Sequence, residues 1–269
     1  MKDKRILYVS SEVVPYLPET EIASTAFNVA KKAHSKGVQT RIFMPRFGVI
    51  NERRHQLHEV IRLSGMNLII NDMDMPLIIK VASIPKERMQ VYFIDNDEYF
   101  KRKAIFSDED DELFSDNDER AIFFAKGVVE TVKKLNWAPD IIHVHGWMAS
   151  LLPLYLKEYY SEEPLFSESK IITSVYNQDF DGTLNKDLVE KIKFDKIPDD
   201  KISILKEPNY TNILKSAVSN SDAIVQGSKE IPKELQEEIS KKDVPTLSFQ
   251  EEDSFESYLN FYKDLISQE

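Results

Sequence analysis

The chain has 269 residues, enough to bury one large hydrophobic core or two modest ones. Its formal net charge of −11 argues against nucleic acid or an anionic membrane as the main partner, because both attract cationic surfaces. The chain has no cysteine, which excludes disulfides, thiolate nucleophiles and cysteine-type zinc sites. No apolar run approaches the length of a membrane span or forms a signal-peptide core, so we expect a cytoplasmic protein.

Residues 5–46 predict a strand–helix–strand unit. Residues 6–9 form an apolar run typical of a buried parallel strand, residues 22–33 repeat apolar side chains at helical spacing, and residues 38–44 form a second apolar run. In such a unit the loop after the first strand normally faces the ligand. That loop, residues 10–21, contains no glycine, although glycine is the residue that lets a backbone approach a phosphate closely.

The rest of the chain continues the alternation of strands and helices. We expect a hairpin over 66–84, strands at 91–94, 141–145, 170–176 and 222–226, a solvated acidic loop at 107–119, and helices at 118–135, 148–159, 184–194, 210–218 and 229–239. This order predicts an α/β fold with one open parallel sheet and helices on both faces. Residues 255–266 repeat apolar side chains at i, i+3, i+4 and i+7, so we expect an amphipathic helix packed back on the domain.

Polar and aromatic residues follow several predicted strands, at the edge where open α/β sheets bind ligands. Glu12 follows the first strand and is either a ligand contact or an N-capping or exposed carboxylate. His145 ends its strand, and Trp147 on the next turn either stacks on a sugar ring or packs between strand and helix. Asn177 and Asp179 follow a later strand, where binding of a polyol and turn formation explain them equally well.

Other kinds of site find little support. His143 and His145 point to one face of their strand, but no third ligand stands at a recognisable spacing, so we predict no metal and interpret His143 as a core residue. The motifs GxGxxG, GxxxxGK[ST] and GxSxG are absent, and we predict no cofactor. Paired carboxylates occur mainly in the acidic loop, which is too hydrophilic to shift a pKa by burial.

Five segments, in order, carry a family resemblance: ILYVSSEVVPY, GVQTRIFMPRFGVI, the stretch from YFKRK to LYLK, ITSVYNQDFDG and TNILKSAVSNSDAIVQGSKEIPKEL. Together they resemble the N-terminal domain of bacterial glycogen synthases and plant starch synthases, the fifth glycosyltransferase family, over residues 4–239. The resemblance implies a Rossmann-like domain, doubly wound and one half of a GT-B fold, formed by residues 1–242. Residues 243–269 would be a linker and a helix docked on that domain. The family transfers glucose from ADP-glucose or UDP-glucose to an α-1,4-glucan without a metal, and its second domain binds most of the nucleotide sugar.

The chain departs from the family pattern at functional positions. The family's KTGGLGDV loop is replaced by LPETEIASTA, in which Glu19 and Glu21 would repel a diphosphate. The family's HDWH becomes HGWM at residues 145–148, and its HN becomes Tyr176-Asn177. The sequence shows no second domain, while SYLNFYKDL is similar to the family's final helix, which crosses back to the first domain. We interpret the chain as a domain that lost the middle of the enzyme and kept this helix.

Three functions follow from the resemblance. The leading hypothesis is a degenerate domain, or pseudoenzyme, that is inactive alone, has no catalytic residue, and binds α-glucan, a sugar nucleotide or a protein partner in glucan metabolism. Its substrate-binding residues would be Glu12, His145, Trp147 and Asn177. The first alternative is an active glucosyltransferase completed by a separately encoded second half. The second is a structural or regulatory subunit with no ligand.

Overall fold

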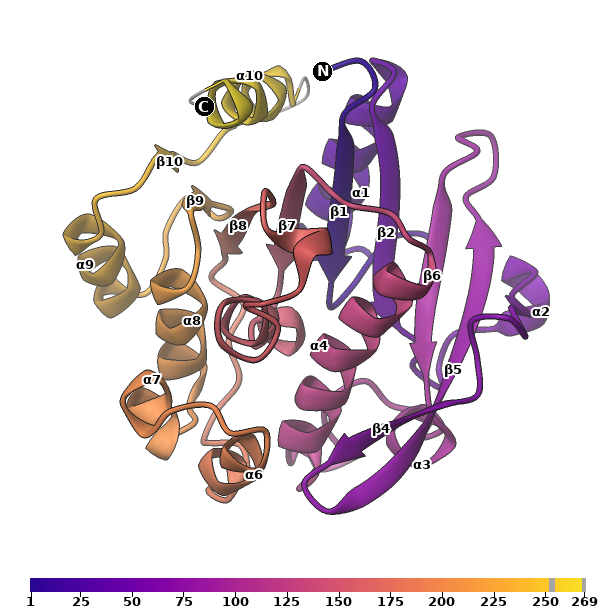
Figure 1. Cartoon of the computed structure of the whole chain (residues 1–269), viewed down its shortest axis with the longest axis vertical. Helices are drawn as coiled ribbons and strands as arrows, with labels where there is room; N and C mark the ends of the chain where they lie inside the picture. Colours follow the sequence, from indigo (N-terminus) through magenta and orange to yellow (C-terminus); the bar gives the residue numbers. More distant parts are fainter. Residues whose placement is uncertain (252–254, 268–269) are drawn as a thin grey trace.

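A computed structural model describes residues 1–251 and 255–267 of the protein. One mixed sheet runs through them in the order β10-β9-β8-β7-β1-β2-β6-β5-β3, with β4 paired to β5 (Figure 1). The strands from β10 to β6 pair in parallel: β1 (Arg5–Ser10), β2 (Gln39–Pro45), β6 (Gln90–Asp95), β7 (Ile141–His145), β8 (Lys170–Val175), β9 (Ala223–Gln226) and β10 (Thr246–Leu247). An antiparallel flank completes it: β3 (His58–Glu59), β4 (Met66–Ile70) and β5 (Met73–Ser83).

Helices cover both faces of the sheet, as the alternating pattern predicts. The α-helices are α1 (Glu21–Ser35), α2 (Glu52–His55), α3 (Asp97–Phe100), α4 (Asn117–Lys134), α5 (Leu152–Leu154), α6 (Leu188–Phe194), α7 (Asp199–Ile202), α8 (Tyr210–Ser219), α9 (Lys233–Lys241) and α10 (Glu256–Ile266). The chain also forms short 3₁₀ turns, η1 (Trp147–Ala149), η3 (Pro164–Phe166) and η4 (Ser203–Lys206), and a π-helical turn, η2 (Tyr155–Tyr159). Within the described ranges, no helix has both the length and the hydropathy that crossing a membrane requires.

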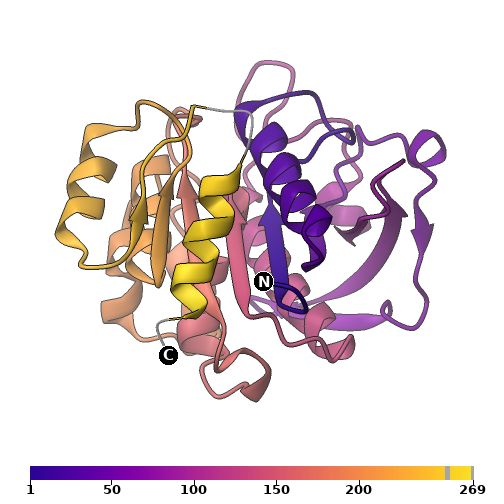
Figure 2. The same cartoon turned by 90° about the horizontal axis from the view of Figure 1, so that it is seen from above.

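The C-terminal helix packs back on the sheet, as its apolar spacing predicts. Figure 2 shows α10 lying across the sheet beside α1, on the face opposite α4 and α8. Four of its side chains are buried: Tyr258, Leu259, Tyr262 and Leu265. The Tyr262 hydroxyl lies 2.7 Å from Nδ1 of His143 on β7, whose Nε2 lies 2.8 Å from the Ser174 hydroxyl on β8. His143 is therefore a core residue, as the sequence indicates, and it fixes the terminal helix to the central strands.

Several predicted elements differ from the structure in their bounds. The hairpin at 66–84 is confirmed. The helix predicted over 148–159 is instead divided into η1, α5 and η2, because Pro153 has no backbone N–H to donate to a continuous helix. The helix predicted from Leu184 begins at Leu188, and the one predicted from Lys229 begins only after Pro232. The acidic loop is shorter than predicted, since α4 begins at Asn117.

The prediction that the acidic segment 107–119 is solvated is wrong for one of its carboxylates. Asp118 is fully buried on α4 and accepts a 2.7 Å bond from the Lys191 ammonium on α6. Burial raises the pKa of the Asp118 carboxyl. This effect outweighs the hydrogen bond and the charge of Lys191, both of which lower that pKa. The sequence pattern missed this because the partner lies 73 residues away.

Candidate functional site

A pocket of about 340 Å³ lies at the carboxyl ends of β1, β7 and β8, which is where open α/β sheets bind ligands. The segments after these strands supply most of its wall, and the segment before α4 and Ile22 of α1 supply the rest. Its lining is Ser11, Glu12, Ile22, Phe106, Ser107, Asp111, Leu113, Trp147, Gln178, Asp179, Phe180 and Asp181. We call it the carboxyl-edge pocket. Glu12 and Trp147, both predicted from the sequence, lie in it, whereas His145 and Asn177 do not.

Glu12 joins the two loops that form one side of the pocket. Its Oε2 accepts a 2.7 Å bond from the Thr20 hydroxyl, and its Oε1 accepts a 3.0 Å bond from the Gln178 amide. Burial raises the pKa of the Glu12 carboxyl, and the two bonds counteract that shift. The capping alternative is wrong, because Thr20 rather than Glu12 caps α1, accepting a 3.0 Å bond from the Ala23 amide.

His145 lies behind the pocket and is completely buried. Its Nδ1 is 2.8 Å from the Tyr176 hydroxyl, and its Nε2 has no hydrogen-bond partner among residues 1–251 and 255–267. Burial lowers the pKa of His145 to about 3, so the ring is neutral at physiological pH. The tautomer decides whether Nε2 of the neutral ring donates or accepts a hydrogen bond, and the ring supplies no positive charge to an anionic ligand.

The turn between β7 and η1 is held by close contacts. Gly146 has φ +81°, and a Cβ added there would lie 2.5 Å from the Ser11 hydroxyl oxygen. That hydroxyl accepts a 3.2 Å bond from the Met148 amide. The glycine therefore brings the β7–η1 turn against the β1–α1 loop, and no larger residue fits.

Trp147 forms part of the pocket wall, but its ring packs against neighbouring aromatic side chains. It is 4% exposed, with ring centroids 4.7 Å from Phe106 and 5.0 Å from Phe180. The sequence left two alternatives for Trp147, stacking on a sugar ring and packing within the domain. Most of the ring surface is used for packing. The aromatic group still gives the pocket an apolar wall of the kind that sugar rings contact.

Asn177 is exposed, and its backbone amide donates a 2.8 Å bond to the Ser228 hydroxyl. The same hydroxyl donates to the Glu21 carboxylate in the first turn of α1. The neighbouring Asp179, which the sequence also indicates, lines the pocket instead. The β8–α6 loop thus directs Asp179, rather than Asn177, to the candidate site.

The charges around the pocket are of one sign. Its lining includes the four carboxylates of Glu12, Asp111, Asp179 and Asp181 and no lysine or arginine. At the start of α1, where a helix attracts anions, Thr20 caps the helix and Glu21 stands in the first turn. The β1–α1 loop therefore provides neither the glycine backbone nor the cations that diphosphate binding uses.

Sequence reasoning missed several residues of the pocket. Thr20 and Gln178 hold Glu12, and Phe106, Phe180 and Asp111 shape the wall. The only signal in the sequence for Gln178 was its place two residues after the end of a strand. The others had no signal of their own as pocket residues, and only the fold brings them to the site. The described residues contain no group of three or more histidine, aspartate and glutamate side chains placed to hold a metal ion.

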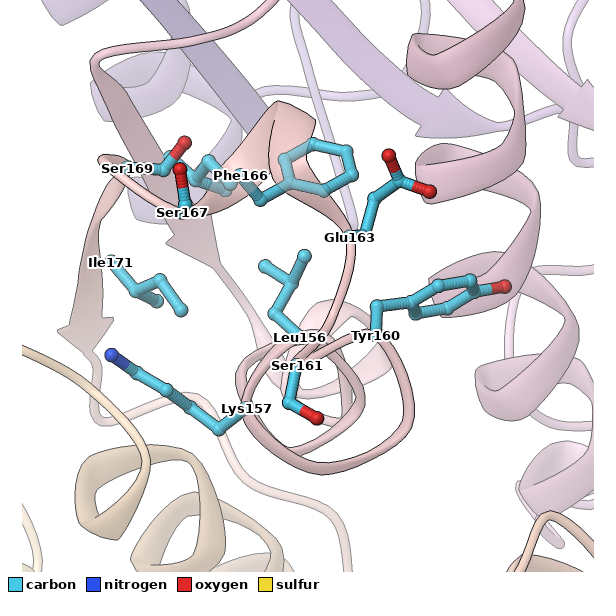
Figure 3. Close-up of a pocket in the computed structure, with 10 residues that line it drawn as sticks. Leu156, Lys157, Tyr160, Ser161, Glu163, Phe166, Ser167, Ser169 and Ile171 are labelled. Carbon is cyan, nitrogen blue, oxygen red and sulfur yellow. The ribbon is translucent and has the colours of Figure 1, made fainter.

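A second hollow, of about 190 Å³, lies at the opposite edge of the sheet, near the amino ends of β7 and β8 (Figure 3). Its lining includes Leu156, Lys157, Tyr160, Ser161, Glu163, Phe166, Ser167, Ser169 and Ile171. The two charged groups in it are already paired, Lys157 with Asp222 at 2.8 Å and Glu163 with Lys133 at 3.3 Å. This hollow has no unpaired charged group for a ligand, and it does not lie at the carboxyl edge of the sheet.

A mostly parallel α/β sheet with helices on both faces and a pocket at its carboxyl edge is typical of Rossmann-like domains. The family model of the starch synthase catalytic domain matches residues 5–246. The chain therefore belongs to this family of glycosyltransferase domains, as its motifs indicate.

Curated relatives and a solved structure agree with this assignment. The chain is 34% identical to the glycogen synthase of Chlorobium luteolum over 234 residues, covering 85% of this chain and 46% of that protein. It is 33% identical to the glycogen synthase of Chlorobaculum tepidum over 248 residues, covering 91% and 49%. The catalytic domain of starch synthase IV from Arabidopsis thaliana, described as bound to ADP and acarbose, has the same fold with a TM-score of 0.77 at 15% identity, covering 96% of this chain and 53% of that one. The chain thus spans about half the length of the relatives it matches.

Proposed function

We propose that this domain binds α-glucan at the carboxyl-edge pocket and does not by itself transfer glucose. The observation that carries the proposal is the lining of the pocket: aromatic side chains and hydrogen-bonding groups, with four carboxylates and no lysine or arginine. Carboxylates and amides hydrogen-bond the hydroxyls of a neutral sugar, whereas the same carboxylates repel a diphosphate. The starch synthase IV structure is described as bound to both ADP and acarbose, and we expect only the carbohydrate type of ligand here.

The β1–α1 loop supports the inactivity of the domain. Glu12 is hydrogen-bonded to Thr20 of the same loop and to Gln178 of the β8–α6 loop, and Glu21 is hydrogen-bonded to Ser228. Removing one preorganised group that stabilises developing charge typically costs about 10²–10³ in rate. Here the lysine and glycines of the family loop and the second histidine of its HDWH motif are replaced together, so glucose transfer by this chain alone falls below detection.

Two assays test the proposal with the purified chain. Calorimetry should show heat of binding with maltooligosaccharides and none with ADP-glucose. Incubation with ADP-glucose and glycogen should release no ADP above a buffer blank. Release of ADP would contradict the inactivity, and the absence of heat with maltooligosaccharides would favour a structural or regulatory subunit without a ligand.

A second candidate function is an active glucosyltransferase that uses a second half supplied by another chain. His145 favours it, because a family histidine stays in place with its Nε2 unpartnered within the described structure. The test adds the separately produced C-terminal half of the Chlorobium luteolum glycogen synthase to this chain. ADP release by the mixture, and not by either part alone, would support this candidate over the first.

A further inference from the structure

A cavity of about 560 Å³ lies where the β1–α1 loop, α2 and the β5–β6 turn meet. It is lined by Tyr16, Arg54, His55, Gln56, Ser83, Ile84, Pro85, Lys86, Arg88 and Gln90. It shares no lining residue with the carboxyl-edge pocket, although both contact the β1–α1 loop. Its volume falls within the range of small-molecule sites in proteins. We call it the β5–β6 cavity.

The charge of this cavity is opposite to that of the chain as a whole. Its lining carries the three exposed cations Arg54, Lys86 and Arg88 and no carboxylate, in a chain of net charge −11. None of these three side chains forms an ion pair with the described residues. The cavity therefore concentrates positive charge without an internal counter-ion, which favours an anionic ligand.

The carboxylates closest in sequence to these cations already form ion pairs with other residues. Glu87 stands between Lys86 and Arg88, and its carboxylate is 2.8 Å from the ammonium of Lys31 on α1. Glu52, two residues before Arg54, is 2.7 Å from the Lys80 ammonium. Neither carboxylate is available to pair with the cations of the cavity.

The rest of the lining suits a small organic group. Tyr16 is 5% exposed, its ring lies 5.0 Å from that of His55, and its hydroxyl is buried without a hydrogen-bond partner among residues 1–251 and 255–267. Burial, followed by the charge of Arg54, lowers the pKa of His55, so this ring is neutral at physiological pH and can donate one N–H. Ile84 and Pro85 add apolar surface. The cavity thus combines a cationic rim with aromatic and apolar groups.

Three lining residues also have backbone conformations that residues other than glycine rarely adopt. Gln56, Lys86 and Arg88 have φ values of 54°, 71° and 57°, and they are three of the nine non-glycine residues with positive φ in the described part of the chain. Such conformations cost energy and cluster at ligand-binding sites, where the surrounding structure maintains them. Here they place two of the three cations on one tight turn.

We propose that the β5–β6 cavity binds a phosphate monoester of a small organic molecule. Arg54, Lys86 and Arg88 hold the phosphate, since guanidinium groups bind phosphate oxygens through pairs of hydrogen bonds. Tyr16 and Ile84 contact the organic part of the ligand. This site is independent of glucan binding at the carboxyl-edge pocket, so either proposal can fail without the other.

Calorimetry with the full chain tests the proposal, using inorganic phosphate, ribose 5-phosphate and uncharged ribose as probes. We expect ribose 5-phosphate to bind more tightly than inorganic phosphate, and ribose to give no heat. The double variant Arg54→Ala, Arg88→Ala should weaken binding of ribose 5-phosphate at least tenfold, because it removes both guanidinium groups. Tyr16→Phe should leave the affinity within twofold, because the lost hydroxyl is buried and the ring remains.

The control is Arg53→Ala, which removes one positive charge from the same exposed helix as Arg54 but lies outside the lining. Its affinity for ribose 5-phosphate should stay within twofold of that of the native chain. A loss as large as that of the double variant would mean that general charge attraction explains the binding and would overturn the proposal. Failure of ribose 5-phosphate to bind, or binding of inorganic phosphate alone, would overturn it as well.

Discussion

The carboxyl-edge pocket and the β5–β6 cavity border the same loop but differ completely in charge. The first is lined by four carboxylates and no lysine or arginine, and the second by three cations and no carboxylate. Glu12, near the start of the loop, faces the first, and Tyr16, four residues later, faces the second. Two hollows on one fold can thus differ in the charge of the ligand they favour, because the fold sets their place and the side chains set their charge.

The largest effect should follow from disturbing the frame of the carboxyl-edge pocket with Gly146→Ala. A Cβ there would lie 2.5 Å from the Ser11 hydroxyl oxygen, and the backbone has φ +81°, so strain and steric conflict add together. We expect a loss of about 3 kcal/mol or more in the free energy of unfolding, measured by urea denaturation. Gly65→Ala is the control, because Gly65 also has φ +81° but no atom within 4 Å of the added Cβ. Equal losses in both variants would show that the contact with Ser11 is unimportant.

The buried histidine behind that pocket should make stability fall in acid. The folded pKa of His145 is lowered to about 3, below the unfolded value, so between pH 6.5 and 3 unfolding takes up a proton. Stability is therefore lost as the pH falls through this window, by about 1.4 kcal/mol per pH unit for one proton. His145→Gln should reduce the slope of unfolding free energy against pH by that amount. Equal slopes for the native chain and the variant between pH 4.5 and 6 would contradict the burial of a neutral ring.

Glu12→Ala should separate the two pockets functionally. It removes the acceptor of the Thr20 and Gln178 bonds and leaves both donors without their partner. We expect the affinity for maltooligosaccharides to fall about tenfold, or about 1.4 kcal/mol, in calorimetry. The affinity for ribose 5-phosphate should stay unchanged. Glu19→Ala, an exposed acid on the same loop, is the control, and an equal loss of glucan affinity there would contradict a specific role for Glu12.

The smallest effect concerns the stability of the Arg54→Ala, Arg88→Ala variant. Both side chains are exposed and have no ion-pair partner within the described ranges, so their removal should change the free energy of unfolding by no more than about 0.5 kcal/mol. Thermal denaturation of the variant and the native chain measures this. A loss above about 1 kcal/mol would show that these cations stabilise the fold, in contrast to a role in binding.

The sequence predicted the parts of the fold that local patterns determine. The apolar runs of β1 and β7 and the helical spacing of α1 and α10 reflect burial on a defined face, so their positions could be recognised. Residues 148–159 were wrongly predicted as one helix, although Pro153 was a visible signal against it. There the missing N–H of the proline determined where the helix breaks, and the spacing of apolar residues wrongly indicated a continuous helix.

The candidate site was predictable only in its location. Strand ends pointed to this edge, because the carboxyl ends of parallel strands meet there. Of the four site residues predicted, Glu12 and Trp147 line the pocket and His145 and Asn177 do not. The bond between Glu12 and Gln178 spans 166 residues, and that between His145 and Tyr176 spans 31, so neither appears in a local pattern. The β5–β6 cavity was not predicted at all, since Arg54 and Arg88 come from different segments that only the fold brings together.

The most direct test of the account compares maltooligosaccharides with ADP-glucose in calorimetry of the native chain. The acidic lining predicts binding of the neutral sugar at the carboxyl-edge pocket, no binding of the sugar nucleotide there, and loss of the sugar signal in Glu12→Ala. ADP-glucose that binds as tightly as the oligosaccharide, and loses that affinity in Glu12→Ala, would contradict the account. It would mean that the pocket retains the nucleotide site of its family.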